Sequence, residues 1–178
     1  MNSYLSPREL AYCGLFGAAS LLLPVLFHML QLGHVFMPMY LPLCTLPFFI
    51  RPLPAAITAI IVPLLSAALT GMPPFYPPIA IMMAIELSVM AALISFIYRH
   101  ITNANEWIVL IPVLLIGRVL YAIMFYAFSN ALNLPAGFLA IMASLRGWPG
   151  IILMIIVIPP LVRMVRKSAW LKTNQSYL

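Results

Sequence analysis

Two residues of opposite charge interrupt long apolar stretches of the sequence, and they are the first candidates for chemistry. Glu86 lies near the middle of one stretch, and Arg118 lies near the middle of the next. A charge at the centre of a membrane-spanning helix costs about 2.5 to 3.5 kcal/mol on insertion scales, so both side chains should face the interior of a bundle. Opposite charges on consecutive antiparallel helices can form a structural ion pair that locks the two helices together.

The same two residues can instead line a pocket for a small polar solute. Arg118 offers a planar fork that suits a carboxylate, and Glu86 can accept a hydrogen bond from a ring nitrogen or an amide. Tyr121 follows one helical turn after Arg118, and Met83 is one of three methionines close to Glu86. Methionines supply polarizable pocket walls, but they equally suit plain helix packing. The structural and the solute-binding interpretations of the pair both stay open.

A lone histidine, His34, stands just before the second apolar stretch and close to a Met-Pro-Met run at residues 37–39. Histidine and methionine can bind a soft metal, but no carboxylate or cysteine accompanies them at a metal-ligand spacing. We therefore expect no metal site. A binding-loop residue and a plain interfacial histidine are the two remaining interpretations.

Small residues follow one another along the first apolar stretch at spacings of three and four. They are Ala11, Gly14 and Ala18, and they should leave a nearly flat strip on one face of a helix. Such strips let membrane helices approach closely. The strip serves either packing within the same bundle or docking of another membrane protein.

No set of catalytic residues is recognisable in this sequence. It contains no GxSxG, HExxH or Walker motif and no aspartate at all. We expect that the chain is not an enzyme and carries no cofactor. If ATP drives its activity, a partner subunit must hydrolyse the nucleotide.

The composition places the chain in a membrane. Of its 178 residues, 65% are hydrophobic and 7% are charged, whereas soluble domains carry roughly 25% charged residues. The net charge of +6 comes from lysines and arginines spread along the chain, a distribution that does not suit a nucleic-acid surface. Lipid is therefore the main solvent, and nucleic acid is not an expected partner.

Six apolar segments alternate with polar or proline-rich breaks. They cover residues 10–30, 35–50, 55–70, 79–98, 107–128 and 148–165. The second segment contains Pro38, Pro42 and Pro47, so it should be kinked or partly irregular and packed against protein or a cavity. We expect an all-α, polytopic membrane bundle of about six transmembrane helices that forms a single domain over residues 1–178.

The basic residues predict the orientation of this bundle. Arg8, Arg51, Arg99 and the cluster after Val162 fall on one side, and Arg146 falls on the other. The positive-inside rule places the richer side, with both termini, in the cytoplasm. The chain is expected to be a multi-pass protein of a bacterial cytoplasmic membrane.

Short motifs along nearly the whole chain resemble the substrate-binding S components of energy-coupling factor (ECF) vitamin transporters. The motifs are HVFMPMYLP at 34–42, PLLS at 63–66, TGMPP at 70–74, EL at 86–87, GR at 117–118 and PGI at 149–151. The resemblance implies a six-helix subunit that binds a vitamin or related micronutrient from outside. It also implies docking, through the first helices, on a transmembrane T component that carries two ATPase subunits.

The resemblance implies that Glu86 and Arg118 lie at the solute pocket. Together with the candidates named above, the expected solute-binding set is Glu86, Arg118, Tyr121, His34, Met83 and Tyr40, and Tyr40 stands where many relatives have histidine. Relatives are often linked to niacin, whose carboxylate suits Arg118, so a niacin-like solute is the first choice. Thiamin precursors, pantothenate and cobalamin fragments remain open. The rival from another class is a six-helix structural scaffold, like the rod-shape protein MreD, which binds no solute.

Overall fold

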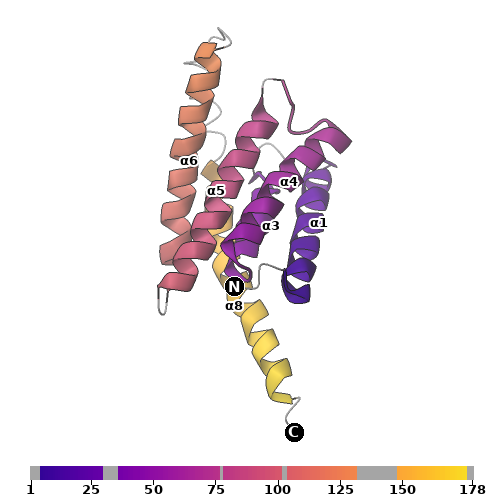
Figure 1. The fold of residues 1–178 in the computed structure, drawn as a ribbon, viewed down its shortest axis with the longest axis vertical. Helices are drawn as coiled ribbons and strands as arrows, with labels where there is room; N and C mark the ends of the chain where they lie inside the picture. Colours follow the sequence, from indigo (N-terminus) through magenta and orange to yellow (C-terminus); the bar gives the residue numbers. More distant parts are fainter. Residues whose placement is uncertain (1–4, 30–35, 77, 102–103, 132–147, 176–178) are drawn as a thin grey trace.

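Over the residues that the structure describes, the protein is an all-helical bundle with five helices that are long and apolar enough to cross a membrane. The computed structural model describes residues 5–29, 36–76, 78–101, 104–131 and 148–175, and none of these lies in a strand. The elements are α1 (Pro7–Met29), α3 (Tyr40–Thr45), the 3-10 helix η1 (Leu46–Phe48), α4 (Pro52–Thr70), α5 (Ile79–His100), α6 (Glu106–Ala131) and α8 (Trp148–Gln175). Figure 1 shows the long helices lying roughly side by side. The prediction of an all-α bundle is confirmed for these residues, and the five long apolar helices are what a multi-pass membrane protein requires.

Apart from the second segment, the predicted span boundaries agree with these helices to within three residues, except at the end of α8. Helix α4 begins at Pro52, three residues earlier than expected, because proline is well tolerated in the first turn of a helix. Helix α8 continues past the predicted end at Val165 and projects beyond the bundle (Figure 1). The predicted interfacial helix at 138–146 lies outside the described residues.

The second apolar segment does not form a spanning helix in its described part. It consists of α3 followed directly by η1, and nearly all of its residues are buried. It packs against α1, α5 and α8, so its irregular backbone is enclosed by protein as membrane burial requires. The expectation of an irregular second segment is confirmed, whereas the count of six spans stays a prediction. We call residues 36–50 the broken segment.

Helix α5 lies at the centre of the described bundle and α1 at its edge. In the most apolar 18-residue stretch of each helix, half of the residues of α5 are buried, against 11% of those of α1. Helix α5 packs against α4, α6 and the broken segment. A polar residue on α5 therefore meets several elements at once, while most of α1 is not covered by the rest of the bundle.

The arginines that the sequence assigns to one side do gather at one end of the bundle, which we call the basic end. Arg51 pairs with Glu9 at the start of α1, and Arg163 of α8 pairs with Glu106 at the start of α6. Arg99, at the end of α5, donates a hydrogen bond to the carbonyl oxygen of Ile50. The cytoplasmic location of the basic end stays a prediction, and Arg146 lies outside the described residues.

Candidate functional site

Glu86 is fully buried in the centre of the bundle. It lies about 10 Å along α5 from Ile79, given a rise of 1.5 Å per residue, and its exposed fraction is 0%. The hydroxyl of Tyr40 in α3 donates a hydrogen bond to Oε2 of Glu86. The other oxygen, Oε1, accepts no hydrogen bond from any described residue. One carboxylate oxygen is therefore paired and the other lacks a donor.

Arg118 of α6 approaches Glu86 without reaching hydrogen-bond distance. Its Nη2 lies 3.9 Å from Oε1 of Glu86, which is close enough for charge attraction but too long for a hydrogen bond. The predicted proximity of the two charges is confirmed. Their long separation leaves the guanidinium and Oε1 each able to bond to something else.

The guanidinium of Arg118 is held mainly by soft, non-oxygen partners. Nη2 donates to the sulfur of Met37 at 3.2 Å, and Cζ lies 5.2 Å from the ring centroid of Tyr40. A guanidinium carries five N–H donors, and among the described residues only the sulfur of Met37 accepts from it. The side chain of Arg118 is 15% exposed, whereas that of Glu86 is 0% exposed. Arg118 is thus positioned by a cation–π contact with Tyr40, and most of its N–H groups donate to no described residue.

Two glycines allow the backbone to close around these charges. A Cβ on Gly117 would lie 2.3 Å from Sδ of Met90 and 3.3 Å from Oε1 of Glu86. A Cβ on Gly150 would lie 2.9 Å from the carbonyl oxygen of Phe36. Gly117 therefore lets α6 approach α5, and Gly150 lets α8 approach the start of the broken segment.

Met37 adopts an unusual backbone conformation where the broken segment begins. Its φ is 46°, in the left-handed region that non-glycine residues rarely occupy. Its side chain reaches Arg118, although the two residues stand 81 positions apart. Sequence reasoning did not identify Met37 as a site residue, and its place in a Met-Pro-Met run was the available signal.

The structure brings together three of the six predicted solute-binding residues: Glu86, Arg118 and Tyr40. Tyr121 is half-buried, and its ring stacks on Phe125 with centroids 6.3 Å apart. No hydrogen bond among the described residues joins it to the pair. Met83 is half-buried against the apolar core, as plain packing predicts. His34 lies outside the described residues.

The small-residue strip of α1 points away from the rest of the described bundle. Ala11, Gly14 and Ala18 are exposed, and a Cβ on Gly14 would meet no atom within 4 Å. Gly17 faces the other way, because a Cβ there would lie 3.6 Å from Cγ2 of Val62. Internal packing therefore uses Gly17, and the strip remains free within the described structure.

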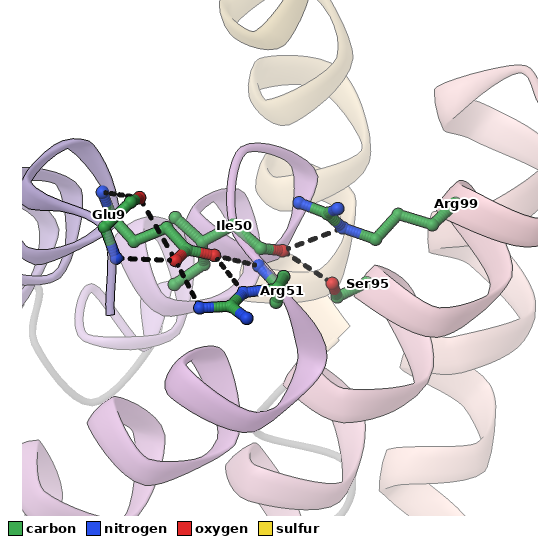
Figure 2. A network of polar contacts seen from close by, with 6 residues as sticks. Glu9, Ile50, Arg51, Ser95 and Arg99 are labelled. Carbon is green, nitrogen blue, oxygen red and sulfur yellow. Dashed lines mark hydrogen bonds and ion pairs between the residues drawn. The ribbon is translucent and has the colours of Figure 1, made fainter. Parts of the chain in front are cut away.

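A second polar network, shown in Figure 2, fastens the end of the broken segment at the basic end. The carbonyl oxygen of Ile50 accepts hydrogen bonds from Oγ of Ser95 at 2.6 Å and from Nε of Arg99 at 3.3 Å. Arg51 donates to Glu9 through Nε and Nη2, each at 2.8 Å. These bonds raise the pKa of Arg51 above its ordinary value. The network joins α1, the broken segment and α5.

Among the described residues, no group of three or more histidine, cysteine, aspartate or glutamate side chains is arranged to hold a metal ion. No protein-family model, curated protein or solved structure matches the chain. The function of the chain must therefore be inferred from the geometry of the buried site and from the sequence motifs.

Proposed function

We propose that this chain is the substrate-binding S component of an ECF-type importer in a bacterial cytoplasmic membrane. Its cargo is a vitamin or related micronutrient, with a niacin-like carboxylate as first choice. The observation that carries the proposal is the state of Arg118. This cation lies within a spanning helix, yet its nearest carboxylate oxygen is 3.9 Å away and its hydrogen bond goes to sulfur.

The donors and acceptors that are left over define the kind of solute. Arg118 can bind a solute carboxylate through two parallel N–H bonds, the strongest geometry open to a guanidinium. Oε1 of Glu86, which lacks a donor among the described residues, can accept from a ring nitrogen that carries a proton, or from an amide. A small heterocyclic acid has both groups, and a thiamin precursor, pantothenate or a cobalamin fragment has some of them.

The remaining features support a subunit of a larger transporter. The sequence contains no Walker motif, so the proposal assigns ATP hydrolysis to two ATPase partner subunits. The exposed strip of Ala11, Gly14 and Ala18 offers a T component a flat surface on α1. Helix α1 lies at the edge of the bundle, and only 11% of its most apolar 18-residue stretch is buried. Its surface is therefore available to a partner.

A structural scaffold is the second candidate, and one observation favours it. The hydroxyl of Tyr40 and the guanidinium of Arg118 both approach Glu86 from other elements, so the cluster can act purely as a lock between α3, α5 and α6. In that case the bundle binds no solute. The two candidates differ in whether removal of Arg118 changes ligand binding or only stability.

The deciding experiment identifies the small molecule carried by the protein. The full chain is purified in mild detergent, its bound compounds are identified by mass spectrometry, and their affinity is measured by calorimetry, with nicotinate as first probe. Arg118→Met should weaken binding by about 30-fold or more, because removing one member of a buried charged hydrogen bond costs about 2 to 5 kcal/mol. The control is Arg163→Met at the basic end, which should bind as the wild type does.

Two results would overturn the proposal. One is wild-type protein that carries no heterocyclic or carboxylate compound and binds none of the candidate solutes. The other is an Arg118→Met variant that elutes as a folded monodisperse protein and binds the solute with unchanged affinity. The first result favours the scaffold, and the second moves the binding site away from α6.

A further inference from the structure

A shallow cavity of about 590 Å³ lies at the basic end and opens widely to the surface. It is separate from the buried site, because neither Glu86 nor Arg118 nor Tyr40 lines it. Its walls come from the start of α1, the end of the broken segment and the end of α5. The proposed solute site does not use it, so it needs an explanation of its own.

Three arginines from these three elements line the cavity, against a single glutamate. They are Arg8, Arg51 and Arg99, and the glutamate is Glu9. Glu9 already accepts hydrogen bonds from Arg51 and from Ser6, so its carboxylate is engaged within the wall. The cavity keeps a formal excess of two positive charges, which favours an anionic ligand.

Arg8 and Arg99 have hydrogen-bond donors left for such a ligand. Arg99 uses Nε for the carbonyl oxygen of Ile50, which fixes the direction of its side chain towards Arg51, as Figure 2 shows. Its terminal nitrogens donate to no described residue, and Arg8 makes no hydrogen bond or ion pair with one. A group with several acceptor oxygens can accept hydrogen bonds from arginines that line the same cavity.

The apolar part of the cavity wall points to a lipid as the source of that group. Leu5, Tyr12 and Phe49 lie beside the arginines, and the exposed face of α1 continues from them along the bundle. A free phosphate ion has no apolar part that could pack against these side chains. A phospholipid does, since its glycerol and acyl chains can follow α1 while its phosphate meets the arginines.

We propose that this cavity binds the phosphate head group of an anionic phospholipid at the membrane surface. Basic pockets between helices on the cytoplasmic side suit anionic head groups, and the positive-inside rule predicts that the basic end faces that side. A head group shared by Arg8 and Arg99 ties the lightly packed α1 to the central α5. This lipid site is independent of the proposed solute site, because the two sites use different residues. A variant can therefore lose lipid binding and keep solute binding, or the reverse.

The test counts lipids bound to the intact chain. Full-length protein in mild detergent is titrated with phosphatidylglycerol, phosphatidylcholine or inorganic phosphate and examined by native mass spectrometry. One phosphatidylglycerol should bind in preference to phosphatidylcholine. Arg8→Gln and Arg99→Gln should each weaken it about fivefold, since a basic residue near the surface contributes about 1 kcal/mol to anionic-lipid attraction.

The matched control is Lys167→Gln, which removes one positive charge at the same end but outside the cavity. It should change lipid affinity less than twofold. Arg8→Gln is the safer of the two cavity variants, because Arg8 makes no hydrogen bond or ion pair with a described residue, whereas Arg99 bonds to Ile50. Equal loss in the control, equal binding of phosphatidylcholine, or displacement of the lipid by millimolar inorganic phosphate would each overturn the proposal.

Discussion

The hydroxyl of Tyr40 donates a hydrogen bond to the carboxylate of Glu86 across 46 positions of sequence. Both side chains are buried, at 2% and 0% exposed. This bond fixes the broken segment against α5 at the depth where the ion pair with Arg118 forms. Tyr40 is therefore part of the structure of the site, whether or not a solute also contacts it.

We expect Tyr40→Phe to destabilise the bundle by about 1 to 3 kcal/mol. The change keeps the ring beneath Arg118 but leaves Oε2 of Glu86 buried without its donor, and an unsatisfied buried group costs about that much. Thermal unfolding in mild detergent measures the loss. Tyr12→Phe is the control, because the hydroxyl of Tyr12 makes no hydrogen bond to a described residue and its ring stacks on Phe49. Equal stability of the two variants would contradict the prediction.

Arg118→Lys separates charge from shape at the proposed solute site. Lysine keeps a cation near Glu86, so the fold should survive with unfolding close to that of the wild type. It loses the planar fork that binds a carboxylate through two bonds. We expect affinity for the carboxylate solute to fall roughly 10-fold to 100-fold, as measured by calorimetry. An unchanged affinity would show that simple charge suffices and that no bidentate contact exists.

The spans were predictable from sequence because a membrane imposes a simple rule. About 20 apolar residues are needed to cross it, and the stretches that became α4, α5 and α6 stand out between prolines, glycines and polar runs. The broken segment was recognisable as irregular from Pro38, Pro42 and Pro47. Its division into α3 and η1 was not, because tertiary packing decides where a proline-rich chain bends.

The site was predictable only in part. The proximity of Glu86 and Arg118 could be predicted from the free-energy cost of a charge in a membrane. This cost requires each side chain to face inward, and the two residues lie on consecutive helices. The contacts of Tyr40 and Met37 could not be derived, because they depend on the register of the broken segment against α5 and α6. Neither could the role of Gly117, which is evident only once Met90 is seen to occupy the space beside it.

Gly117→Ala should destabilise the protein by about 1 to 3 kcal/mol, the usual cost of overpacking. The new Cβ would lie 2.3 Å from Sδ of Met90, so the methionine or the helix must move. Adding Met90→Ala should recover part of the loss, because it removes the clashing atom. Gly14→Ala is the matched control, with no atom within 4 Å of its Cβ, and it should unfold at or slightly above the wild-type temperature, because alanine favours a helix interior over glycine. No recovery in the double variant would contradict a local clash.

Ser95→Ala tests the second network. The hydroxyl of Ser95 is fully buried and donates to Ile50 at 2.6 Å, which joins α5 to the broken segment. Its loss should cost about 1 kcal/mol, as for a typical buried hydrogen bond. Ser20→Ala is the control, since that equally buried hydroxyl only bonds back to Phe16 in its own helix. Urea or thermal unfolding should therefore show a larger shift for Ser95→Ala.

Gly14→Leu tests docking of a transporter partner without disturbing the fold. The strip faces outward and a Cβ on Gly14 meets no atom, so a leucine side chain should project into lipid and leave solute binding unchanged. It should nevertheless block close approach of another helix, and co-purification with a co-expressed T component should fall at least about 10-fold. Gly17→Leu provides the contrast, because it would clash with Val62 and weaken the bundle itself. If Gly14→Leu leaves complex formation intact, the strip is not the docking surface, and a partner must bind α1 through its larger apolar side chains or another helix.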